Sequence, residues 1–200
     1  MFRLRELERK DLPVINKWRN KEELISLLGT PFRFINVDVD IKWYESYMLN
    51  RNSAVRCAIT EFDNDEILGL VSLTSINYVN LTAEFHIMIG EEKSCGKGMG
   101  TFAVKAMIEH AFYNMNLRRI ELGVLADNYR ALHVYEKVGF KKEDIKRQAI
   151  YKKGKYVDLI SCAILRDEYA SRKTIFRWFR ISNVRSERLS YKKLLHKKVL

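Results

Sequence analysis

Cys95-Gly96-Lys97-Gly98-Met99-Gly100-Thr101 sets three glycines within five residues, directly before a segment whose apolar side chains recur at helical spacing. Residues 83–89, just upstream, alternate in a way that predicts a β-strand. In a strand, glycine turn and helix of this kind, several free backbone N–H groups point outward from the helix N-terminus and can bind an anion such as a phosphate. The turn alone is a weak signal, since similar turns occur with nothing bound.

Two common phosphate-binding loops do not fit this context. A Walker loop needs Gly-Lys-Ser or Gly-Lys-Thr, and neither tripeptide follows the glycines. A Rossmann turn belongs to the first strand–helix–strand unit of a parallel sheet, whereas three consecutive antiparallel strands, 54–62, 67–76 and 83–89, are predicted here before the turn. The glycine turn therefore indicates another class of fold.

The rest of the chain supplies further strands and helices around this centre. Upstream, a strand over 2–7 is expected, then a helix capped by Asp11 and another capped by Asp38 or Asp40. Downstream, the pattern predicts a largely buried helix after Gly100, a strand over 118–125, a helix over 128–138 and two strands over 140–150 and 156–165.

A second motif, Asn128-Tyr129-Arg130-Ala131-Leu132-His133-Val134-Tyr135-Glu136-Lys137-Val138-Gly139-Phe140, begins about thirty residues after the turn. With the glycine turn it resembles the paired signature of the GNAT superfamily of N-acetyltransferases, over residues 1 to about 169. The resemblance implies an α/β (α+β) fold, with a mixed and mostly antiparallel sheet of about seven strands, flanking helices and splayed central strands. Cys95 departs from the family pattern, which usually has Gln or Arg there, and this removes one possible phosphate contact.

The resemblance also implies acetyl-CoA as co-substrate, with its pyrophosphate on the turn and its pantetheine arm between the strands ending near Gly90 and Leu125. A backbone N–H near residues 88–90 would polarise the thioester carbonyl. The expected cofactor-binding residues are Met88, Ile89, Gly90, Gly96, Lys97, Gly98, Met99, Gly100, Thr101, Asn128 and Tyr135. No metal is expected.

Acetyl transfer to an amine needs a neutral nucleophile and a proton for the departing thiolate. Tyr135 lies where the family's general acid usually lies, and a phenol with a pKa near 10 is protonated at neutral pH. Packing on an apolar helix face is the alternative role for Tyr135. Glu84 and His86 share one face of their strand and are the candidates for the base, although both can equally be structural strand residues.

The first fifty residues form the acceptor side in this family, and the expected substrate-binding residues are Arg19, Asn20, Arg33 and Tyr44. Residues 18–20, 43–44 and 150–158 resemble two branches, one acetylating ribosomal-protein N-termini and the other nucleotide-linked amino sugars. We favour the amino sugar, because Arg19, Arg33 and Arg51 can pair with a nucleotide diphosphate. A protein N-terminus or a polyamine is the alternative acceptor, and a non-catalytic CoA-binding module is the alternative class of protein.

The basic character of the chain is concentrated at its end. Ten Lys or Arg against Glu187 give residues 170–200 a charge of +9, which leaves +2 of the total +11 for residues 1–169. Apolar and aromatic residues among these cations suit an amphipathic helix on an anionic membrane surface, or packing on the enzyme or a second subunit. Nucleic acid is a weaker candidate, because residues 1–169 add little positive charge.

The N-terminus has no apolar run of the length needed by a signal peptide or membrane span, so a cytoplasmic enzyme, peripheral to the membrane at most, is expected. The odd number of widely spaced cysteines, Cys57, Cys95 and Cys162, indicates reduced thiols rather than disulfides or a zinc site. We predict one catalytic domain over 1–169 and a basic extension over 170–200.

Overall fold

The computed structural model describes residues 1–90 and 97–171. The chain divides into two units, residues 1–164 and 165–200, and in the second unit residues 166–171 are helical. Cys95, Gly96 and most of the basic extension lie outside the described residues, so the role of the extension and the boundary expected at residue 169 stay predictions.

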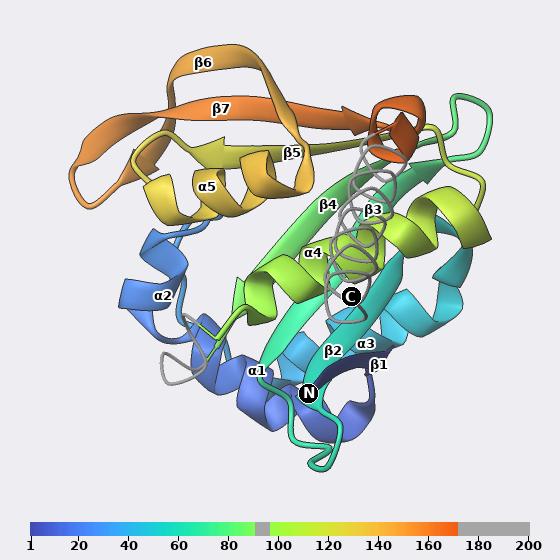
Figure 1. Cartoon of the computed structure of the whole chain (residues 1–200). Coiled ribbons are helices and arrows are strands. Elements are labelled where there is room, and N and C mark those ends of the chain that lie inside the picture. The colour runs from blue at the N-terminus through green and yellow to red at the C-terminus, as the bar shows by residue number, and fades with distance from the viewer. Residues whose placement is uncertain (91–96, 172–200) are drawn as a thin grey trace, which may run out of the picture. The chain divides into compact units, whose positions relative to one another are not determined.

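Residues 1–164 contain a seven-stranded sheet with the order β1-β2-β3-β4-β5-β7-β6 (Figure 1). β1 to β4 are successive antiparallel neighbours, β4 and β5 pair in parallel, and β6 and β7 form an antiparallel hairpin. The mixed, mostly antiparallel sheet expected from the sequence is confirmed. The strands are β1 Phe2–Glu6, β2 Val55–Glu61, β3 Gly69–Asn77, β4 Thr82–Ile89, β5 Arg119–Leu125, β6 Lys141–Lys152 and β7 Lys155–Leu165.

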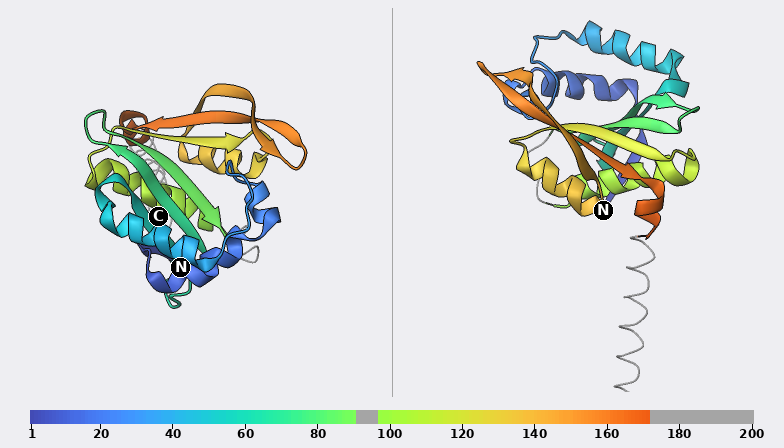
Figure 2. Two further views of the ribbon diagram at one scale, coloured as in Figure 1. Left: turned by 180° about the vertical axis from the view of Figure 1, so that it is seen from behind. Right: turned by 90° about the horizontal axis from the view of Figure 1, so that it is seen from above.

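Helices cover both faces of this sheet. Figure 2 shows α1 and α3 on one face, with α4 and α5 on the other. The helix after the glycine turn continues directly into a short π-helical stretch, His110–Asn114. The α-helices are α1 Leu12–Arg19, α2 Glu22–Ser26, α3 Val37–Leu49, α4 Met99–Glu109 and α5 Tyr129–Val138, and short 3₁₀ turns occupy Arg9–Asp11 and Arg51–Ser53.

The two central strands diverge, as the family resemblance implies. Within these two fully described strands, β4 and β5 pair over three residues, from Thr82 with Arg119 to Glu84 with Glu121. Beyond that point the strands separate toward their C-terminal ends (Figure 1). The separation leaves backbone N–H and C=O groups without a neighbouring strand, which is where a ligand can enter a sheet.

Asp11 occupies the N-cap position of α1 as expected, whereas the cap expected at Asp38 or Asp40 is wrong. The Asp11 carboxylate makes no capping bond to α1 and instead accepts hydrogen bonds from the Glu8 N–H and the Arg5 guanidinium. α3 is capped by Asn36, whose side chain accepts from the Val39 N–H, and Asp40 lies fully buried in the first turn. The carboxylates of Asp11 and Asp40 are thus used by polar contacts other than helix capping.

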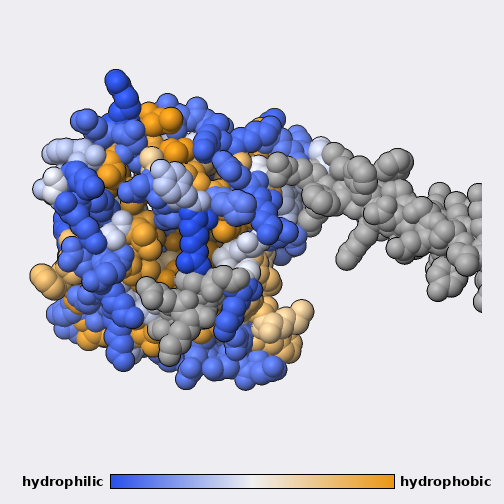
Figure 3. Space-filling model, turned by 60° about the vertical axis from the view of Figure 1, so that its left-hand side comes forward, coloured by the Kyte–Doolittle hydropathy of each residue, from blue (hydrophilic) through white to orange (hydrophobic). Residues whose placement is uncertain are grey.

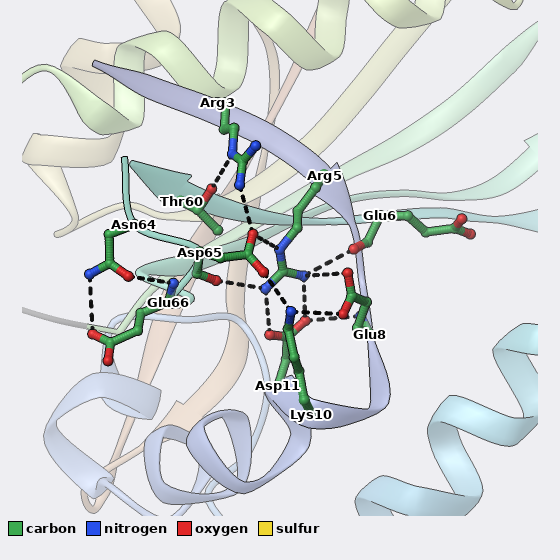
Figure 4. A network of polar contacts seen from close by, with 10 residues as sticks. All are labelled: Arg3, Arg5, Glu6, Glu8, Lys10, Asp11, Thr60, Asn64, Asp65 and Glu66. Carbon is green, nitrogen blue, oxygen red and sulfur yellow. Dashed lines mark hydrogen bonds and ion pairs between the residues drawn. The ribbon is translucent and has the colours of Figure 1, made fainter. Parts of the chain in front are cut away.

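The contacts of Asp11 belong to a charged network that ties β1 to the turn between β2 and β3 (Figure 4). The Arg5 guanidinium binds both carboxylate oxygens of Asp11, at 2.8 and 2.7 Å, and its Nε lies 2.8 Å from the Asp65 carboxylate. Arg3 and Lys10 bind the same Asp65 carboxylate. The contacts with Lys10 and Arg5, led by the hydrogen bond from Lys10, lower the pKa of Asp65 to about 2.

Candidate active site

A cavity of about 1010 Å³ opens where β4 and β5 separate. Its lining comes from the C-terminal halves of β4 and β5, the starts of α4 and α5, and the acceptor-side segments that contain α1, α2 and the residues leading to α3. Figure 3 shows apolar side chains recessed among hydrophilic ones on this side of the molecule. The volume is sufficient for an extended cofactor together with a small substrate.

The glycine turn borders this cavity at the N-terminus of α4. Gly98 has the left-handed conformation, with φ of +81°. Apart from its two chain neighbours, no described residue has an atom within 4 Å of the Cβ that another residue would carry there. Gly98, Met99, Gly100 and Thr101 line the cavity. The first N–H groups of α4 have no partner within the helix, so this end of the cavity suits a pyrophosphate. Lys97 is exposed and is not among the described lining residues.

The hydrogen bonding of β4 indicates which backbone N–H of residues 88–90 can face the thioester carbonyl. The Gly90 N–H donates to the Leu68 carbonyl at 3.0 Å, so it faces β3. Because N–H groups alternate along a strand, the Met88 N–H also faces β3 and the Ile89 N–H faces the opening toward β5. Of residues 88–90, Ile89 alone presents its N–H to the cavity. Gly90 instead has a steric role, since its missing Cβ leaves room for the Trp18 ring.

Tyr135 lies on α5 and lines the cavity beside β4. Its ring packs edge-on against Phe85 and Phe140, with centroid distances of 6.2 and 5.7 Å. Burial raises the pKa of the Tyr135 phenol to about 12. The packing anticipated as an alternative is therefore present together with access to the cavity, and the phenol stays protonated at neutral pH.

Asn128 and Lys152 connect α5 and the β6–β7 hairpin to the acceptor side. The Asn128 side chain caps α5 by accepting from the Ala131 N–H, and its amide donates to the Leu27 carbonyl at 3.0 Å. The Lys152 ammonium donates to the carbonyls of Ile25 and Thr30. Asn128 lines the cavity as expected, but both ends of its amide are used within the protein.

Glu84 and His86 point to the same face of β4 and line the cavity. The His86 Nε2 lies 3.7 Å from Glu84 Oε2 and 2.9 Å from Thr74 Oγ1. The side chain of His86 is 50% exposed and that of Glu84 is 43% exposed. Burial lowers the pKa of His86, with the positive charge of Arg56 adding to this effect and Glu84 opposing it. The neutral imidazole is thus favoured, which is the form that can accept a proton.

The four expected substrate-binding residues divide into two groups. Arg19 and Arg33 line the cavity, and the Arg19 guanidinium is bound to the buried Asp40 carboxylate. Asn20 and Tyr44 are not among the described lining residues. The Asn20 amide bonds both backbone groups of Ile35, and Tyr44 packs against the apolar cluster around Trp18. A role in substrate binding stays a prediction for both.

Two further lining residues were not expected from the sequence, Arg56 on β2 and Ser72 on β3. Trp43 on α3, which belongs to the acceptor-region pattern of residues 43–44, also lines the cavity. Arg56 is the one cation in β2, and the residues that follow it up to Thr60 are apolar or small, which was the available signal. Within residues 1–90 and 97–171, no group of three His, Cys, Asp or Glu could hold a metal ion. No helix in these ranges is long and apolar enough to cross a membrane.

The domain model described as acetyltransferase (GNAT) domain matches residues 2–141. The chain belongs to the GNAT acetyltransferase family. The spermidine N(1)-acetyltransferases of Vibrio cholerae and Escherichia coli K12 are both 31% identical to it, over 84% and 86% of this chain and 95% and 90% of their own lengths. The crystal structure of the Vibrio cholerae spermidine N-acetyltransferase with CoA and spermine matches with a TM-score of 0.79 at 29% identity, covering 84% of this chain and 98% of that one.

This GNAT family member is an acetyl-CoA-dependent N-acetyltransferase, and its fold class and co-substrate are confirmed. The comparisons do not support the nucleotide-linked amino sugar favoured from the arginines of the acceptor region. They favour the polyamine that was the alternative. The reason for the error is visible in the structure, because Arg19 is bound to Asp40 and Arg51 pairs with Glu6.

Proposed function

We propose that the enzyme transfers the acetyl group of acetyl-CoA to a primary amine of a polyamine such as spermidine, by direct attack in a ternary complex. The observation that carries this proposal is the meeting, in one cavity, of the α4 turn, Tyr135 and the Glu84–His86 pair. The named activities of relatives that match over nearly their whole length support the polyamine class.

One part of the cavity binds the cofactor and the other binds the acceptor amine. The free N–H groups at the start of α4 bind the pyrophosphate, and the Ile89 N–H polarises the thioester carbonyl. On the acceptor side, Glu84 is the one carboxylate among the described lining residues and attracts the ammonium of the acceptor. This arrangement directs one amine toward the opening between β4 and β5.

The reaction needs three proton transfers. The acceptor ammonium first loses a proton to His86, or through water to Glu84, and becomes a nucleophile. Its nitrogen bonds to the acetyl carbon, the carbon–sulfur bond breaks, and the Tyr135 hydroxyl gives its proton to the departing thiolate. The nitrogen of the new amide loses its second proton to solvent, and solvent returns a proton to Tyr135. Because burial keeps Tyr135 protonated up to a pH of about 12, the phenol is available as an acid throughout the physiological range.

Release of free CoA thiol tests this proposal. The full chain is incubated with acetyl-CoA and, separately, with spermidine, spermine, a nucleotide-linked amino sugar and a peptide with a free N-terminus. We expect the highest kcat/KM with a polyamine, and acetylated product in equal amount to CoA. A higher kcat/KM for the sugar or the peptide would overturn the polyamine assignment. Calorimetric binding of acetyl-CoA without turnover of any amine would favour the non-catalytic module.

A further inference from the structure

Arg56, Ser72 and His86 form a row across three adjacent strands of the sheet. Arg56 on β2 lies opposite Ser72 on β3, and Ser72 lies opposite His86 on β4. Residues directly opposite one another point to the same face of a sheet. All three line the cavity, so Arg56 is on the acceptor side, two strands away from the candidate base.

The Arg56 guanidinium is held by aromatic rings rather than by a carboxylate. Its central carbon lies 4.7 Å from the centroid of the Trp43 ring and 5.7 Å from that of Tyr47. Its Nε is buried without a hydrogen-bond partner within the described residues. Other partly buried arginines of this chain, such as Arg5 and Arg119, have close carboxylate partners.

An unpaired cation at this depth costs free energy, since burial removes water from a charge that no anion compensates. This cost lowers the stability of the folded protein. The same burial lowers the pKa of Arg56 itself. Stacking on Trp43 recovers part of the cost. An apolar side chain at this position would avoid the cost, so the charge indicates a role in the cavity.

We propose that Arg56 is a positioning residue, which adds to burial in favouring the uncharged His86 imidazole, the form that can take the proton of the acceptor ammonium. The inference rests on the proposed function. A fixed positive charge disfavours a second one nearby, both on the imidazole and on the bound amine. The proton passes from the ammonium nitrogen to a ring nitrogen of His86 and then to solvent, leaving the amine lone pair free to attack.

The other charged groups around His86 leave Arg56 as the main source of positive potential. Glu84 opposes Arg56, at 3.7 Å from the ring. Glu121, opposite Glu84 on β5, is bound by Arg119 at 3.2 Å. Ser72 and Thr74 on β3 are uncharged, and the pKa of Tyr47 on α3 is raised to about 12, chiefly by burial. Arg19 on α1 is bound to Asp40, whereas Arg33 is an exposed cation of the cavity lining. Among the cations, Arg56 is the one whose charge lowers the pKa of His86.

The size of the effect follows from strand spacing. β2 and β4 are separated by β3, so they lie two strand spacings, or about 10 Å, apart. At that distance, with an effective dielectric constant between about 25 and 50, one unit charge shifts a pKa by roughly half to one unit. Replacing Arg56 by a neutral residue should raise the pKa of His86 by that amount.

The test is an NMR titration of the His86 imidazole in the full chain, with its signal identified by its loss in His86→Gln. Arg56→Gln and Arg56→Met should raise the pKa of His86 by roughly half to one unit, while Arg56→Lys should leave it near the wild-type value. Arg51→Gln is the matched control, because Arg51 pairs with Glu6 at the surface and is 55% exposed. Arg56→Met retains a long side chain over Trp43 if the Gln variant does not fold.

The same variants should move the acidic limb of the kcat/KM profile for the polyamine to higher pH by the same amount. An unchanged His86 pKa in both neutral variants would overturn the proposal. So would an equal shift in Arg56→Lys, because the effect would then come from packing. If the wild type acetylates no amine, the proposed function fails, whereas the titration still decides whether Arg56 acts on His86.

Discussion

Replacing Gly90 by alanine tests the packing on which the acceptor side depends. A Cβ at Gly90 would lie 1.8 to 2.3 Å from three atoms of the Trp18 ring. Ordinary contacts between carbon atoms are about 3.5 to 4.0 Å, so the ring would have to move by more than 1 Å. Trp18 is a fully buried side chain, 1% exposed, so the ring cannot move without displacing its neighbours. Overpacking of this kind costs about 1–3 kcal/mol, and this overlap belongs at the upper end.

A loss of about 3 kcal/mol should lower the Tm by roughly 6–12 °C in a domain of this size. Urea unfolding followed by tryptophan fluorescence and calorimetry measures both quantities. Gly29→Ala is the control, because its Cβ would meet only Leu159, at 3.9 Å. In a Trp18→Leu background the cost of Gly90→Ala should fall by more than half. A cost below about 0.5 kcal/mol, or one unchanged by Trp18→Leu, would refute the steric account.

Three further predictions concern the site and the charged network. Tyr135→Phe should lower kcat by about 10²- to 10⁴-fold with little change in acetyl-CoA affinity, measured by thiol release and calorimetry; wild-type turnover would remove Tyr135 from the mechanism. Gly100→Glu should abolish acetyl-CoA binding, since a carboxylate would face the pyrophosphate site. Gly100→Ala is the control, and retained acetyl-CoA affinity in a folded Glu variant would contradict the assignment. Asp65→Asn should remove one component of acid destabilisation: because the folded pKa of Asp65 is lowered to about 2, the contribution of its charge is present above the unfolded value of about 4 and is lost as pH falls toward 2. Urea midpoints between pH 2 and 5 should then vary less in the variant than in the wild type.

Local sequence patterns predicted most of the secondary structure. The strands over 54–62, 67–76 and 83–89 were expected within about two residues of β2, β3 and β4, because alternation with period two is a local property. Asn128 and Gly139 bracket α5 as predicted. The cap of α3 was missed, since Asn36 caps this helix and Arg19, about twenty residues away on α1, binds the buried Asp40. Asp11 was placed correctly at the start of α1, but its carboxylate binds Arg5 instead of the helix.

The sequence by itself determined the family, the glycine turn before α4, and the shared face of Glu84 and His86, since each depends on residues close together in the chain. Tertiary structure decided the rest of the site. Only strand pairing brings Arg56 into register with His86, thirty positions further along. Only the packing of Trp18 gives Gly90 a steric role, and only the hydrogen bond to Leu68 leaves Ile89 as the group that faces the cavity. These contacts join segments that are far apart in the sequence, so no local pattern predicts them. They form only when the sheet and α1 pack together.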